Sequence, residues 1–404
     1  MGIKSKKHRS ATPIYRESGY ARQLPELSHG EKILLGVGLA LLLLSLALLA
    51  FARGNSSWVE KFYSRGFYPT VAGGLAWLTA KVRFSLAEWV VVLFVLGCLT
   101  AVGLYIWQMV YYSRFKVRVT LHFLLRVVAV AGVVLTLFIT FGGLNYYRRS
   151  FAEYSGLERK PTELSQLVAL CQELSDEAGV LREQLPEDSA GVSDCADSSY
   201  AMAITANRCY QSLGIQYPQY DPLLRMATVT RPKPVLFSQA MSYMQIVGVF
   251  FPYTMEANVN VHTTKYDIPN AMCHELAHIA GFMREDEANF LSYLACRAGD
   301  DLFFRYSGTM LALLHSTNAL YSQNADQHAL VMNGLTDGIK RDLEASRTYF
   351  ARYDTAFGDF ATSVNNTYLK ANNQLDGVAS YGRMVDLLLA DYRLRHQDGN
   401  TTKK

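Results

Sequence analysis

Three long apolar runs dominate the first third of the chain, at residues 33–52, 86–112 and 121–144. Each run is long enough to cross a hydrocarbon layer of about 30 Å as a helix. Glu88 lies near one end of the second run and Arg126 about a turn into the third, where long side chains can reach the membrane surface. Mostly polar residues precede the first run, which favours a membrane anchor over a cleaved signal peptide. The pattern therefore predicts three membrane spans.

A shorter apolar segment, residues 67–80, lies between the first two spans. It is too short to cross, so we expect an interfacial or re-entrant helix, and a crossing here would reverse the predicted topology. Basic residues crowd the tail 1–32 and the loop around residues 114–118, which the positive-inside bias places in the cytoplasm. The transmembrane region 33–146 then leaves residues 147–404 outside the cytoplasm.

Helical spacing of apolar residues dominates the exported part, over 147–182, 196–213 and from Cys296 to about Arg395. The prolines of 217–234 predict an extended loop. Residues Val249 to His262 differ, because apolar and polar side chains alternate from Tyr253 onwards, as in a strand with one face covered. The fold class expected is mainly α, with a small β element. On the plainest interpretation the polar face of the strand meets water.

Composition and charge limit the kinds of binding partner that we expect. Half of the 404 residues are hydrophobic and the net charge is only +4. The basic residues flank the apolar runs and form no continuous stripe, so we expect contact with a lipid bilayer and none with nucleic acid. Of six cysteines, Cys98 lies in a span and an odd number remain in the exported part, which favours buried reduced thiols over a disulfide framework.

The candidate chemistry lies in one stretch, residues 270–296. There His274-Glu275-Leu276-Ala277-His278 forms an HExxH motif. Residues four apart share one face of a helix, so His274 and His278 can offer two imidazole nitrogens to one zinc ion. Glu275, one step round, can hold a water bound to that ion and act as general base.

A catalytic zinc site needs a third protein ligand and an open fourth position. Gly281 is a plausible left-handed end for the motif helix, after which a second helix can turn back towards the metal. Glu285 and Glu287 compete for the third position. We favour Glu285, because Asn289 lies four residues further on the same face and can hydrogen-bond a zinc-bound histidine.

HExxH followed by E-x-x-A-N on a second helix resembles the gluzincin group of metallopeptidases, which includes thermolysin and the CAAX-prenyl endopeptidases. The resemblance implies that His274, His278 and Glu285 are zinc ligands, Glu275 the base and Asn289 a residue that orients a ligand, where many relatives have Asp. The interval from His278 to Glu285 is much shorter than in most gluzincins.

The whole chain is also similar to a bacterial membrane family described only as a domain of unknown function, with the signature H-E-L-A-H…G-F-x-R-E-D-E-A-N-F. This resemblance implies a zincin-like domain on the outer face of the bacterial cell membrane, held by several spans. Gluzincins have a strand edge beside the zinc helix, where a peptide substrate adds as a further strand. Candidate substrate or oxyanion contacts are, on this basis, Glu256, Asn258, His262, Tyr368, Lys370 and Tyr381.

Two functions follow as hypotheses. The first is a membrane-anchored zinc metallopeptidase that hydrolyses peptide bonds of an unknown peptide or protein. The second is a non-catalytic, zinc-containing binding or sensing module, which a fourth protein ligand would favour. A transporter is the weakest option, because the spans contain no paired charges along a path.

Overall fold

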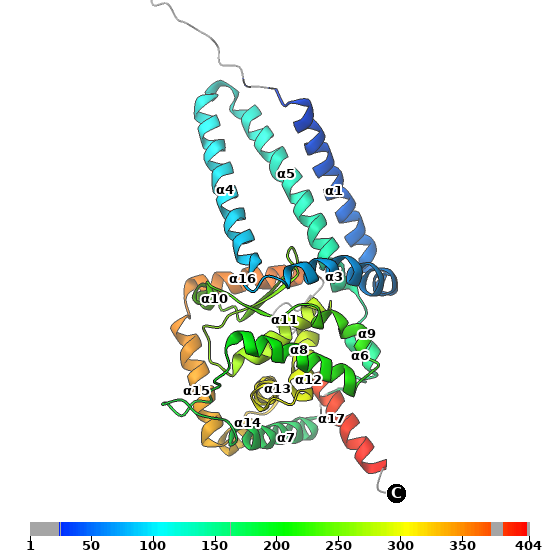
Figure 1. The fold of residues 1–404 in the computed structure, drawn as a ribbon, viewed down its shortest axis with the longest axis vertical. Coiled ribbons are helices and arrows are strands. Elements are labelled where there is room, and N and C mark those ends of the chain that lie inside the picture. Colours follow the sequence, from blue (N-terminus) through cyan, green and yellow to red (C-terminus); the bar gives the residue numbers. More distant parts are fainter. Residues whose placement is uncertain (1–23, 25, 162, 373–382, 402–404) are drawn as a thin grey trace, which may run out of the picture.

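Three long helices, α1 (His29–Arg53), α4 (Leu86–Tyr111) and α5 (Lys116–Phe141), stand above a helical domain (Figure 1). The computed structural model describes residue 24 and the ranges 26–161, 163–372 and 383–401. All three helices are long and apolar enough to cross a membrane, the third together with a preceding 3-10 turn, η2 (Ser113–Phe115). The third predicted span is displaced, since its helix begins before residue 121 and ends before residue 144.

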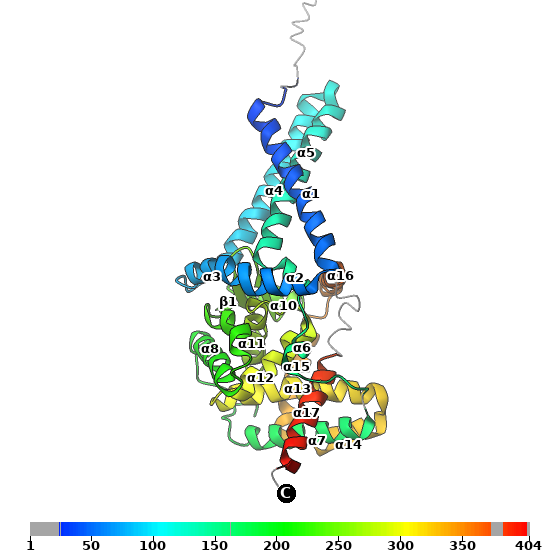
Figure 2. The same ribbon diagram turned by 90° about the vertical axis from the view of Figure 1, so that its right-hand side faces the viewer.

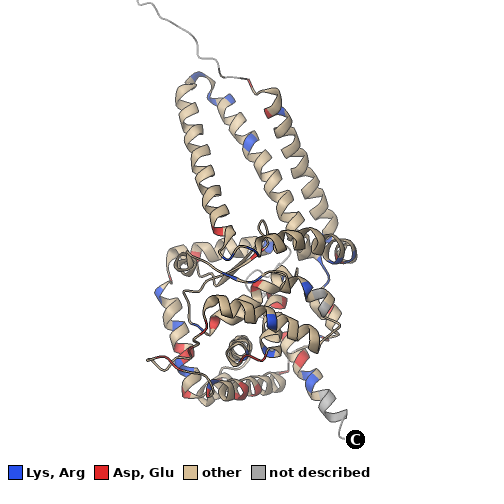
Figure 3. Ribbon diagram, in the orientation of Figure 1, with Lys and Arg blue, Asp and Glu red and all other residues tan. Residues whose placement is uncertain are grey.

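Small residues let α1 and α5 pack closely. A Cβ atom on Gly38 would lie 2.5 Å from the Cα of Ala129, and one on Gly132 would lie 2.0 Å from the Gly38 carbonyl oxygen. Close backbone approach of this kind is typical of helices that associate in lipid. Arg126, the charge within the third apolar run, pairs with Glu31 at 2.9 Å. Along the rest of their length the long helices carry few charges (Figure 3).

The segment after α1 lies across the ends of the three long helices. It consists of α2 (Ser56–Trp58), a π-helical stretch η1 (Val59–Phe67) and α3 (Tyr68–Thr79) (Figures 1 and 2). The Tyr68 hydroxyl donates to the Ile279 carbonyl at 2.9 Å, which joins this segment to the domain below. The structure therefore places residues 67–80 crosswise, as an interfacial helix would lie, and not as a fourth long helix.

Helices make up most of the remaining chain. Their bounds are η3 (Gly143–Tyr147), α6 (Phe151–Ser155), α7 (Leu164–Arg182), α8 (Ser199–Gln216), α9 (Asp221–Leu224), η4 (Arg225–Thr228), α10 (Ser238–Tyr243), α11 (Asp267–Ile279), α12 (Glu285–Ala298), α13 (Leu302–Gln323), α14 (Ala325–Gly334), α15 (Asp337–Arg352), α16 (Ala356–Ala371) and α17 (Met384–Thr401). The predicted mainly helical class is confirmed. The predicted loop 217–234 is wrong in part, because it contains two short helices.

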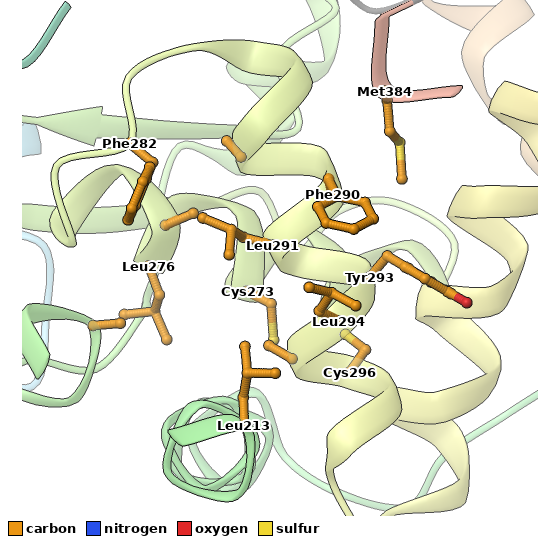
Figure 4. Packing of buried hydrophobic residues seen from close by; sticks show 14 of the residues in the cluster. Leu213, Cys273, Leu276, Phe282, Phe290, Leu291, Tyr293, Leu294, Cys296 and Met384 are labelled. Atoms are coloured by element: carbon orange, nitrogen blue, oxygen red, sulfur yellow. The ribbon is translucent and has the colours of Figure 1, made fainter. Parts of the chain in front are cut away.

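The core of the domain forms where α11 and α12 pack against each other and against α8 and α13. Leu276, Phe290 and Leu291 meet in this core and are fully buried (Figure 4). Cys273 and Cys296 lie in the same core, where burial raises the pKa of both thiols. All six cysteines are free, and four of them are buried as predicted, whereas Cys98 is exposed and Cys195 is half-buried.

A three-stranded sheet adjoins α11. Its strands are β1 (Lys233–Pro234), β2 (Gly248–Phe251) and β3 (Glu256–Val259), in the order β1-β3-β2. The central strand β3 is buried on both faces, so the expectation that its polar side chains face water is wrong. The edge nearest α11 belongs to β2.

The polar residues of β3 hold the start of α4. Glu256 accepts hydrogen bonds from the amides of Leu86 (3.2 Å) and Ala87 (2.7 Å) and forms a buried ion pair with Lys233. Asn258 accepts one from the Ser85 hydroxyl at 2.7 Å. A carboxylate at a helix N-terminus satisfies amides that have no partner within the helix. The sheet thus anchors the second long helix to the domain.

We expect Glu256→Ala to destabilise the protein strongly, because it leaves Lys233 and two helix amides buried without their partner. Breaking a buried ion pair costs about 3–5 kcal/mol. Thermal unfolding in detergent measures the effect. Glu344→Ala, which removes one partner of the exposed pair with Arg347, is the matched control and should leave the transition unchanged. Equal transitions for the two variants would contradict an anchoring role for Glu256.

Candidate metal centre

A left-handed glycine ends the motif helix. Gly281 has a φ of +86°, and its amide donates to the His278 carbonyl at 2.9 Å. The Phe282 amide donates to the Ala277 carbonyl at 3.0 Å, which completes the helix end as a glycine-terminated motif. A Cβ atom here would lie only 2.8 Å from Nδ2 of Asn145. The predicted role of Gly281 is confirmed, and the chain turns back into α12 directly after it.

The turn at Gly281 brings together three side chains that can act as metal ligands. Nε2 of His274 lies 3.2 Å from Glu285 Oε2, and Nε2 of His278 lies 3.7 Å from Glu285 Oε1. The three side chains offer donor atoms that all lie within 4.8 Å of one another. Zinc bonds of about 2.0–2.1 Å in a tetrahedron separate two ligand atoms by about 3.3 Å. The spacing of the cluster fits such an ion.

Both histidines are oriented through their other ring nitrogen. Nδ1 of His274 lies 2.8 Å from Oδ1 of Asn289, and Nδ1 of His278 lies 2.8 Å from the Phe282 carbonyl oxygen. Each Nδ1 faces an oxygen that can accept its proton, and the Nε2 atoms of both rings face the Glu285 carboxylate. Metal-binding histidines are held in this way in most proteins.

The electrostatics of the cluster favour a positive charge between its donors. Burial alone would lower the pKa of His274, yet the Glu285 carboxylate beside it raises that pKa to about 9. Burial and the neighbouring His274 lower the pKa of His278 to about 4. The buried Glu285 carboxylate thus favours a positive charge beside it, on His274 or on a bound cation.

Glu275 is buried between the histidines and strand β2. A Cβ atom on Gly248 would lie 2.4 Å from Glu275 Oε1, so only glycine fits opposite this carboxylate. The Phe250 amide also hydrogen-bonds Glu275, while burial raises the pKa of Glu275 to about 8. Among the described residues, Glu275 Oε2 has no hydrogen-bond partner.

The two acidic neighbours of Glu285 are engaged elsewhere. Glu287 accepts a hydrogen bond from the Phe151 amide at 2.9 Å and pairs with Arg284 at 3.3 Å. Asp286 lies 3.7 Å from Arg159. Of the two candidate third ligands, only Glu285 belongs to the cluster.

Several residues singled out from the sequence lie away from the cluster or outside the described ranges. His262 contacts Tyr349 at 3.1 Å, and Lys370 is exposed on α16. Glu256 and Asn258 are buried and hydrogen-bonded to the start of α4, so the structure does not bring them to the cluster. Tyr381 lies outside the described residues.

Tyr146 was not predicted from the sequence. It follows the third long helix, and its hydroxyl lies 3.0 Å from the hydroxyl of Tyr368 on α16. Burial and Tyr368 raise the pKa of Tyr146, and the carboxylates of Glu285 and Glu275 raise it further. The local sequence around Tyr146 does not indicate its contact with Tyr368, because the two residues are 222 positions apart.

The fold and the cluster define a mainly helical protein with three helices suited to crossing a membrane and a His-His-Glu group in its domain. The chain belongs to a family described as protein of unknown function (DUF3810), whose model matches residues 63–389. The match includes the whole cluster. No curated protein and no solved structure matches the chain.

Proposed function

We propose that the protein is a membrane-anchored, zinc-dependent metallopeptidase of the zincin type. The observation that carries the proposal is the meeting of His274, His278 and Glu285 with a buried glutamate, Glu275, beside them. Two histidines and a glutamate are the donor set of many catalytic zinc sites. Within the described part of the chain the group has three donors and no fourth, which supports catalysis over a purely structural ion.

His274, His278 and Glu285 would hold the zinc, which when bound polarises a carbonyl group and makes water more acidic. Glu275 receives a proton from the attacking water through its unpaired Oε2. Water oxygen adds to the carbonyl carbon, the carbon–nitrogen bond breaks, and Glu275 returns the proton to the leaving amine.

Strand β2 is the candidate substrate edge, in place of the alternating segment from Tyr253 onwards that the sequence indicated. It is an edge strand, its Gly248 lies against Glu275, and the Phe250 ring centre is 6.4 Å from that of His278. Val249 is exposed at this edge. An extended peptide that adds to β2 would have its backbone beside the cluster. Tyr146 and Tyr368 are the candidate donors to the oxyanion.

Metal analysis combined with peptide cleavage tests the proposal. The full chain, purified in lipid nanodiscs, should contain about one zinc per molecule and cleave members of a mixed peptide library, with new termini identified by mass spectrometry. A chelator should abolish cleavage and added zinc should restore it. Bound zinc without cleavage would favour the binding or sensing module, and a chain that retains no zinc would contradict both functions.

A further inference from the structure

Helix α16 has three distinct faces. Gly358 and Leu369 face the domain and are buried, with Gly358 packed against Gln245. Asp359 and Lys370 belong to a polar face. A third face is apolar yet exposed, formed by residues spaced three and four apart. Its members are Phe357 (55% exposed), Phe360 (64%), Val364 (52%) and Tyr368 (42%).

The apolar face points towards the ends of the membrane helices. Tyr368 is its last member, and its ring lies edge-on to Phe138 of α5 at a centroid distance of 6.4 Å. Phe138 lies in the last turn of that long helix. Since the other three residues share the stripe with Tyr368, they face the same side. α16 lies at the level of α3, across the ends of the long helices (Figure 1).

A second apolar feature lies at the same level. Glu88, in the first turn of α4, accepts hydrogen bonds from the amides of Leu236 (3.0 Å) and Phe237 (2.8 Å). The side chains of Leu236 and Phe237 are exposed. These contacts tie an exposed apolar loop to the end of a helix suited to crossing the membrane.

We propose that α16 is an interfacial helix whose Phe357, Phe360 and Val364 insert into the lipid bilayer at the domain side of the membrane. A narrow apolar stripe beside a polar face is typical of helices that lie in the membrane surface. The occupant of the stripe is lipid, because the stripe adjoins the ends of the long helices. The same helix also contacts Tyr146 through the hydroxyl of Tyr368. The proposal does not depend on zinc or on catalysis.

Site-directed spin labelling tests this placement. In a Cys98→Ser, Cys195→Ser background, a nitroxide is attached to Phe360→Cys and, as matched control on the polar face, to Asp359→Cys. Both proteins are reconstituted as full chains in lipid nanodiscs. Collisions with oxygen, which concentrates in lipid, and with a water-soluble nickel chelate report the surroundings of each label.

We expect the label at position 360 to collide mainly with oxygen and the label at position 359 mainly with the chelate. Val364→Cys and Lys370→Cys provide a second pair, in case one substitution disturbs folding. Chelate-accessible labels at both 360 and 364 would overturn the proposal, because the stripe would then face water. Labels shielded from both agents would overturn it in favour of a second protein surface, such as another copy of the chain.

Discussion

Glu275→Gln should lower the rate of peptide hydrolysis by about 10²- to 10⁴-fold and leave zinc bound. Glutamine has nearly the shape of glutamate but cannot take up the proton of an attacking water. Glu275 is not one of the three clustered donors, so the metal content should not change. The measurement is the rate of cleavage of the best library peptide, with zinc quantified in the same samples.

Two controls accompany this variant. Glu344→Gln changes an exposed glutamate on α15 and should keep full activity. Unfolding temperatures of Glu275→Gln and the unchanged protein should agree closely, since the carboxylate makes no ion pair. A Glu275→Gln protein with undiminished activity would remove Glu275 from the mechanism, whether or not zinc is present.

Glu285→Ala and Glu287→Ala should separate metal binding from stability. Glu285 is the carboxylate of the cluster, so its loss should weaken zinc binding by more than the roughly 10- to 100-fold that follows from loss of a residue that only orients a ligand. Glu287 caps the Phe151 amide and pairs with Arg284. Its loss should cost about 1–3 kcal/mol of stability while zinc is retained.

Zinc competition with a coloured chelator and thermal unfolding in detergent measure the two effects on the same preparations. Asn289→Ala is an informative third variant, because Asn289 only orients His274. The zinc affinity of Asn289→Ala should therefore lie between those of Glu285→Ala and Glu287→Ala. Loss of zinc from Glu287→Ala but not from Glu285→Ala would show that the third ligand has been assigned to the wrong glutamate.

Local periodicity explains why much of this protein was predictable. The three long helices require only an uninterrupted apolar run, and both histidines share a face because they lie four residues apart on one helix. The sequence also predicts that Glu285 lies close to the two histidines, since Gly281 can end one helix in a left-handed turn and allow the next helix to fold back. Each of these features depends on residues close in sequence.

The misassigned strand shows where that reasoning fails. Alternation from Tyr253 to His262 indicates that one face differs from the other, but not what covers the polar face. In the folded chain Glu256 meets the amide of Ala87, which is 169 residues away, and so its carboxylate becomes an anchor for a long helix. An alternating pattern cannot distinguish water from a buried polar partner.

The sequence alone was sufficient for the apolar helices, the motif helix and the choice of donors, because these depend on spacing within one or two turns of chain. Which strand forms the free edge, which tyrosine contacts Tyr368 and which side of α16 adjoins α5 depend on contacts between distant segments. Such contacts form only when many separate elements pack at once, and no short stretch of residues contains that information.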